Sequence, residues 1–175
     1  MIPQNNIIDI LLKNYKTVLK YDFTTYKNHV YRIYNYTILL DADKTNYDKY
    51  AIAAVFHDLG IFTHSFDYLT PSIELATNYL KEINKKEWIE EICLMIDNHH
   101  KISFYKGDFA HTVEIFRKAD WIDVTWGLKK YSLKKVNFKA IKKAFPNNGF
   151  HLFLLKQFLK WFVKHPLNPL PMFKR

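Results

Sequence analysis

The chain has 175 residues, of which 49% are apolar and 25% are charged, a balance that indicates a folded protein and excludes an intrinsically disordered one. Its one cysteine, Cys93, cannot form an internal disulfide, which suits a reducing compartment. No apolar run approaches the roughly 18 residues of a membrane span, and the start of the chain lacks the pattern of a secretory signal. We therefore expect a cytoplasmic protein without a membrane partner.

Basic residues outnumber acidic ones by 26 to 17, which gives a formal net charge of +9. Such an excess can serve a nucleic acid, an anionic small substrate or only a solvated surface. Many of the lysines stand in separate pairs along the chain, and no known nucleic-acid-binding motif surrounds them. We interpret most of them as surface lysines, which argues against a nucleic-acid partner.

Helical periodicity runs through most of the chain. Apolar spacing, capping residues, prolines and glycines predict helices at 6–20, 27–40, 45–60, from 70 onward, at 85–98 and 108–127, and two more that open near 137 and 147. The proline-rich end, PLNPLPMFKR, predicts an extended tail. With only 4 glycines and no glycine-rich phosphate loop, the pattern indicates a single all-α domain over residues 1–175 with about seven or eight helices.

Histidines and carboxylates occur at the ends or on the core-facing sides of four of these helices. Asp120 lies in register with apolar Val113 and Phe116, so its carboxylate faces the core and needs a partner there. Helical folds build metal sites from such inward-projecting side chains. The candidates are His29, His57, Asp58, His99, His100 and Asp120. Mixed nitrogen and oxygen ligands suit Mn, Fe, Co, Ni, Zn or Mg, and four ligands on an octahedral ion leave two positions open.

The ordered set His29, His57-Asp58 and Asp120 resembles the H…HD…D signature of the HD-domain superfamily of metal-dependent phosphohydrolases. The flanking blocks NHVYRIYNY, AAVFHDLG and FRKAD are similar to that family over a core motif region of residues 27–127. The stretch HDLGIFTHSFDYLTPS is similar to a bacterial subgroup known only as HD-domain proteins. The resemblance implies an HD-like helical bundle in which these four residues bind one divalent metal ion. The helices and tail over 137–175 lie outside the core motif region.

The same resemblance implies hydrolysis of a phosphate ester, with a nucleotide or another small phosphorylated metabolite as the anionic substrate. Asp58 is expected to help hold the attacking water, or to bridge two ions if a second is bound. His64 and Asp67 follow the metal-binding helix in a loop that can bend over the site, and we expect them to supply a proton to the leaving group.

Four further residues are candidates for substrate binding. Lys118 and Arg32 can offset the charge of a phosphate. His99 and His100 can contact the substrate or hold a second ion. Because adjacent residues of a helix point about 100° apart, we expect only one of these two histidines to face the site.

Two alternative functions stay open. Some proteins of this fold hold two irons and oxidise their substrate with dioxygen, and they share extra histidines between the HD pair and the last aspartate. A non-catalytic module that binds a nucleotide or RNA is the other alternative. Ile61 stands where the cyclic-dinucleotide phosphodiesterases of the superfamily have lysine, which argues against that subfamily.

Overall fold

The computed structural model describes residues 3–168 and residue 170. Its α-helices are α1 (Asn6–Asn14), α2 (Lys16–Leu19), α3 (Phe23–Leu40), α4 (Tyr47–Phe56), α5 (Gly60–Thr63), α6 (Leu69–Glu82), α7 (Ile89–Asn98), α8 (Ala110–Val124), α9 (Lys135–Ala144) and α10 (Phe150–Lys164). Eight of these have nine residues or more, and the described part of the chain contains no strand. The predicted all-α class, with about seven or eight helices, is therefore confirmed.

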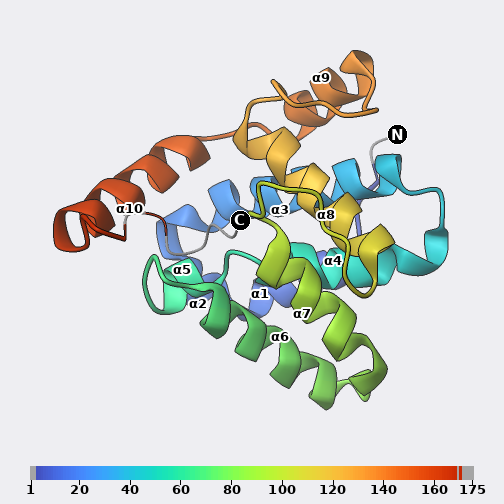
Figure 1. Cartoon of the computed structure of the whole chain (residues 1–175), viewed down its shortest axis with the longest axis horizontal. Helices are drawn as coiled ribbons and strands as arrows, with labels where there is room; N and C mark the ends of the chain where they lie inside the picture. The colour runs from blue at the N-terminus through green and yellow to red at the C-terminus, as the bar shows by residue number, and fades with distance from the viewer. Residues whose placement is uncertain (1–2, 169, 171–175) are drawn as a thin grey trace.

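Helix α3 lies at the centre of the bundle, where it packs against α4 and α8 (Figure 1). Its residues from His29 to Thr37 are all buried, which explains why so much of its length is apolar or aromatic. Helix α7 contacts α4, α6 and α8, and thus completes the wall opposite α3. The four helices that carry the candidate ligands therefore surround one interior point.

The expected helix over 45–60 is shorter than its pattern indicates, because α4 ends at Phe56. His57 and Asp58 lie in the turn that follows, and Gly60 begins α5 instead of ending a helix. A Cβ on Gly60 would collide with the carbonyl oxygen of Tyr68 and lie 2.9 Å from Ser72 Oγ. The glycine thus serves close packing of α5 on the start of α6.

Helix α10 attaches to the bundle by its first turns and then extends away from it (Figure 1). The Phe150 ring is buried and stacks on His29, with ring centroids 3.9 Å apart. The Phe153 ring stacks on Phe62 of α5 at 5.0 Å. Most of the proline-rich end, for which we expected an extended tail, lies outside the described residues.

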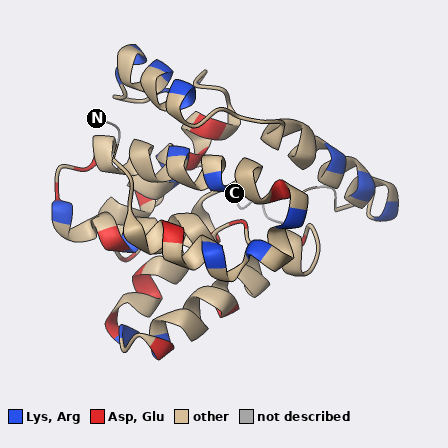
Figure 2. Ribbon diagram, turned by 180° about the vertical axis from the view of Figure 1, so that it is seen from behind, with Lys and Arg blue, Asp and Glu red and all other residues tan. Residues whose placement is uncertain are grey.

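Charge is distributed unevenly along the chain. All 17 acidic residues occur up to Asp123, whereas the remainder of the sequence contains 12 Lys and Arg residues. Figure 2 shows lysines on α9 and α10 and no acidic residue on either helix. No helix in the described part of the chain is long and apolar enough to cross a membrane.

Candidate metal centre

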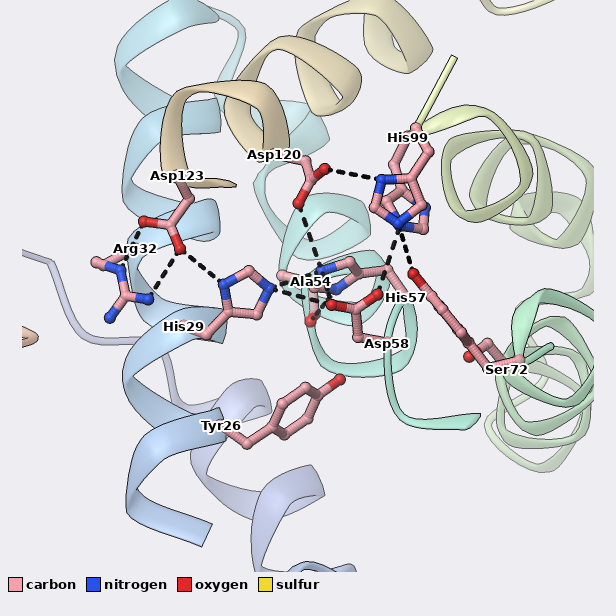
Figure 3. Close-up of polar contacts among 12 residues, drawn as sticks. Tyr26, His29, Arg32, Ala54, His57, Asp58, Ser72, His99, Asp120 and Asp123 are labelled. Atoms are coloured by element: carbon pink, nitrogen blue, oxygen red, sulfur yellow. Dashed lines mark hydrogen bonds and ion pairs between the residues drawn. The ribbon is translucent and has the colours of Figure 1, made fainter. Parts of the chain in front are cut away.

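His29 and His57 meet in the interior with their Nε2 atoms 2.9 Å apart (Figure 3). His29 Nδ1 lies 2.8 Å from Asp123 Oδ2, and His57 Nδ1 lies 2.8 Å from the carbonyl oxygen of Ala54. Each Nδ1 has only an acceptor beside it, so it carries the proton and donates it. With one proton on each ring, the two Nε2 lone pairs face each other in a fully buried space, and, against the effect of burial, Asp123 and Asp58 raise the pKa of His29.

This arrangement fits a bound cation. Facing lone pairs repel unless a proton or a metal ion lies between them. Two imidazoles that bind one ion through bonds of about 2.0–2.1 Å, roughly at right angles, place their nitrogens about 3 Å apart, close to the observed 2.9 Å. Fixing the proton on the outer nitrogen is also how proteins orient metal-binding histidines.

Asp58 lies beside both imidazoles and directs its two carboxylate oxygens to different neighbours. Oδ2 lies 3.5 Å from His29 Nε2 and 3.4 Å from His57 Nε2. Oδ1 lies 3.5 Å from Nε2 of His99, whose Nδ1 donates to the carbonyl oxygen of Ile96. Asp58 Oδ1 and His99 Nε2 are buried and have no hydrogen-bond partner among the described residues. Two groups of ligand atoms, each compact enough for one ion, thus share Asp58: His29, His57 and Asp58, and Asp58, His99 and His100.

Asp120 reaches the same centre from α8, as its register in the sequence indicates. Its Oδ1 lies 4.0 Å from His57 Nε2, and its Oδ2 lies 3.4 Å from His100 Nδ1. Neither oxygen has a hydrogen-bond partner among the described residues, although both are buried. A buried carboxylate in this state is costly, and a cation is the partner that such a site lacks.

The pKa values of the centre reflect burial and mutual charge. Burial, together with the neighbouring histidines, lowers the pKa of His57 to about 4, against the opposing effect of Asp58 and Asp120. Burial also opposes the ionised form of Asp58, but His57, His29 and His99 outweigh it and hold the Asp58 pKa well below its usual range. At neutral pH His57 is therefore neutral and Asp58 is ionised, which are the forms that bind metal.

A second layer holds His29 in place. Arg32 Nε and Nη2 donate to the two oxygens of Asp123, at 2.6 and 2.8 Å. The side chains of His29, Arg32 and Asp123 are all buried. Arg32 also donates to the carbonyl oxygens of Phe145 and Pro146. We expected Arg32 to bind substrate, but the structure places its guanidinium on Asp123, on the Nδ1 side of His29 and away from the Nε2 atom that faces His57.

Sequence reasoning missed Asp123, although a signal for it exists. Asp123 follows Asp120 by three residues on α8, just as Arg32 follows His29 by three on α3. Residues three apart share one face of a helix. Because α3 packs on α8, these two pairs face each other.

Both His99 and His100 reach the centre, so the expectation that only one would face it is wrong. The 100° separation applies within a helix, whereas α7 ends at Asn98 and the two histidines lie in the turn beyond it. Their ring centroids are 3.9 Å apart. The Tyr68 hydroxyl lies 2.5 Å from His100 Nε2.

The structure does not bring the other three candidates into the centre. Lys118 Nζ lies 3.6 Å from Glu114 Oε1 and makes cation–π contacts with the rings of Phe104 and Tyr131. His64 and Asp67 have exposed side chains in the loop between α5 and α6. Two other residues of that segment, Phe66 and Tyr68, line a cavity beside the His/Asp cluster instead.

This cavity has a volume of about 230 Å³ and opens directly on Asp58 and His100. Its remaining walls are apolar and come from the α5–α6 loop, from α8 and α10, and from Leu170 beyond α10. The cavity thus borders the ligand cluster at two of its members, whereas the others are fully buried, namely His29, His57, His99 and Asp120.

The fold and the site define a class of protein: an all-α bundle with histidines and aspartates gathered around a buried cation site. The family model described as "HD domain" matches residues 26–125, which is more than half of the chain. The chain therefore belongs to the HD-domain family. No match was found among curated proteins or among solved structures.

Proposed function

We propose that the protein is a metal-dependent hydrolase of phosphate esters. The observation that carries this proposal is the junction of the cluster and the cavity, because Asp58 belongs to both. Family membership supports the same class of reaction, since HD domains are typically metal-dependent hydrolases. A divalent ion held by His29, His57, Asp58 and Asp120 would supply Lewis acidity and would lower the pKa of a bound water molecule toward neutrality.

The protein's own groups fix the geometry of this reaction. Asp123 and the carbonyl oxygen of Ala54 hold His29 and His57 with their Nε2 atoms inward. The cluster is buried among the described residues, and the cavity borders it at Asp58 and His100. A phosphate group can therefore approach from that side, with its ester group in the cavity.

Tyr68 is the group we assign to the leaving-group side. Burial and the charges of Asp58 and Asp120 raise the Tyr68 pKa well above its ordinary value, so the phenol keeps its proton at neutral pH. Its hydroxyl contacts His100 and it lines the cavity. Tyr68 with His100 is thus better placed to donate a hydrogen bond to an ester oxygen than the exposed His64 and Asp67.

Asp58 would also serve as a ligand to a second ion in the same centre. Its Oδ1 and His99 Nε2 are buried without hydrogen-bond partners among the described residues, as expected of ligand atoms. His100 lies on the same side and borders the cavity. Two ions that share a carboxylate can stabilise both the attacking and the leaving oxygen of a displacement at phosphorus.

The proposal is tested by metal reconstitution. Protein freed of metal is loaded separately with Mn, Co, Mg, Fe, Ni or Zn and assayed for phosphate release from a panel of phosphate esters. We expect turnover with at least one metal, its loss in Asp58→Asn, and wild-type turnover in Asp108→Asn, which makes the same change at an exposed loop position. Absence of turnover with every metal would refute the proposal. Iron near two per chain with oxygen consumption and no phosphate release would establish the oxygenase alternative instead.

A further inference from the structure

The cavity beside the metal centre has an unusual composition for a site that takes a phosphate ester. Apart from Asp58 and His100, its lining consists of aromatic and aliphatic side chains, among them Phe66, Leu154 and Phe158. No described Lys or Arg lines it. Polar hydroxyl groups of a sugar, or a second phosphate, would find few hydrogen-bond partners on these walls, and their burial there would be unfavourable.

The apolar wall continues onto the surface of α10. Leu155 lines the cavity and is also 50% exposed. The exposed apolar side chains of α10 include Leu152, Leu155, Leu159, Phe162 and Val163, which recur at the spacing of one helical face. An apolar group in the cavity therefore has a continuous apolar path outward along α10.

Charge along this path favours an anion with an apolar body. Lys156, Lys160 and Lys164 follow α10 at intervals of four residues, beside its exposed apolar face. No acidic residue occurs anywhere in the sequence after Asp123, so these lysines have no acidic neighbours on their own segment. An approaching amphiphilic anion thus meets positive charge and apolar surface together.

We propose that the substrate is an amphiphilic phosphate ester, with the phosphate at the metal cluster and an alkyl or aryl group in the apolar cavity against α10. This inference rests on the proposed phosphohydrolase function, whose substrate class it specifies. The cavity is smaller than the roughly 300–1,000 Å³ of drug-sized sites. It therefore holds a short alkyl chain up to the length of hexyl, or one ring, and only a chain longer than hexyl continues over Leu155 onto the exposed face of α10.

Binding of alkylphosphonates tests this proposal independently of turnover, because their carbon–phosphorus bond is not hydrolysed as an ester. Calorimetry with manganese-loaded protein compares methyl-, butyl- and hexylphosphonic acid, and phenylphosphonic acid as the aryl case. Each buried methylene should raise the affinity about threefold to fourfold. Equal affinity for methyl- and hexylphosphonic acid would overturn the inference.

Two leucines of α10 provide a matched pair of variants. Leu155 and Leu159 are each 50% exposed, but only Leu155 lines the cavity. Leu155→Asp should lower the affinity for hexylphosphonic acid about tenfold and leave the affinity for methylphosphonic acid unchanged, because it places a carboxylate on the apolar wall. Leu159→Asp adds the same charge to the same helix and should bind both ligands as the wild type does. An equal loss of affinity for hexylphosphonic acid in both variants would contradict the placement of the alkyl group in the cavity.

An activity comparison separates this inference from the proposed function. If manganese-loaded protein hydrolyses ribose 5-phosphate more efficiently than hexyl phosphate, the phosphohydrolase stands and the amphiphilic substrate is refuted. If affinity rises with chain length but no ester is hydrolysed, the apolar subsite stands and the reaction class is refuted. Preference for hexyl phosphate in kcat/KM supports both.

Discussion

The sharpest prediction concerns how many metal ions the centre holds and which residues hold each one. The two candidate ligand groups share Asp58 but differ in the histidines that complete them. His99 Nε2 faces Asp58 Oδ1, whereas His29 and His57 face Oδ2. We expect wild type to bind two manganese ions per chain, His99→Ala to bind one, and Asp58→Asn to bind none.

The magnitude follows from linkage between binding and folding. An ion present at a hundred times its dissociation constant stabilises the folded state by about 2.7 kcal/mol. For a chain of this size, each kcal/mol raises the midpoint of thermal unfolding by about 2–4 °C. One ion should therefore raise the midpoint by about 5–10 °C, and two ions by about twice as much.

The assay combines metal content, measured by mass spectrometry, with thermal unfolding of each variant with and without manganese. The shift in the unfolding midpoint is taken relative to the same variant without metal, because removing a buried imidazole also lowers the free energy of unfolding directly. Asp108→Asn provides the exposed control. A His99→Ala variant that keeps the wild-type stoichiometry and shift would refute the assignment of a second ion. An Asp58→Asn variant that keeps either ion would refute the shared carboxylate.

Three further changes probe the surroundings of the centre. Asp123→Asn leaves the proposed ligands intact but weakens the support of His29, and manganese affinity measured by equilibrium dialysis should fall about 10–100-fold; an unchanged affinity would contradict this role. Gly60→Ala should lower the free energy of unfolding by about 1–3 kcal/mol in denaturant titrations, because the new methyl group collides with the Tyr68 carbonyl oxygen. An unchanged free energy of unfolding would show that the Tyr68 carbonyl moves aside at little cost. Burial opposes ionisation of Asp41, but hydrogen bonds to its carboxylate lower its pKa to about 2. The ionised form of Asp41 therefore stabilises the fold by about 2 kcal/mol above about pH 4, and this stabilisation is lost as the pH falls to about 2. The difference in free energy of unfolding between wild type and Asp41→Asn should therefore disappear over that interval. A difference that stays constant with pH would show that ionisation of Asp41 does not cause it.

Much of the centre could be predicted because its residues obey local rules. Asp120 is found from a single helical repeat, since a carboxylate aligned with Val113 and Phe116 must face the interior. The HD dipeptide at the end of an apolar helix needs partners for the same reason. What the helical rule could not give was the conformation after Asn98, where the chain leaves the helix and brings both histidines inward.

The cavity and the α5–α6 loop depend on contacts that no local pattern encodes. His64 and Asp67 are chemically suitable proton donors, but the loop turns them to solvent and directs Phe66 and Tyr68 inward. The amphipathic pattern of α10 is visible in the sequence. Its position beside the metal ligands is not, because it results from Phe150 stacking on His29, more than a hundred residues earlier in the chain.

The two oxygens of Asp58 serve different neighbours, and this has a consequence for how the centre fills. Asp58 is buried with both oxygens already directed, so little rotational freedom is left to lose when an ion binds. A first ion would neutralise much of the negative charge that attracts a second, and the two like charges would repel each other. The two positions would then fill one after the other as the metal concentration rises, and a titration would show two separate steps.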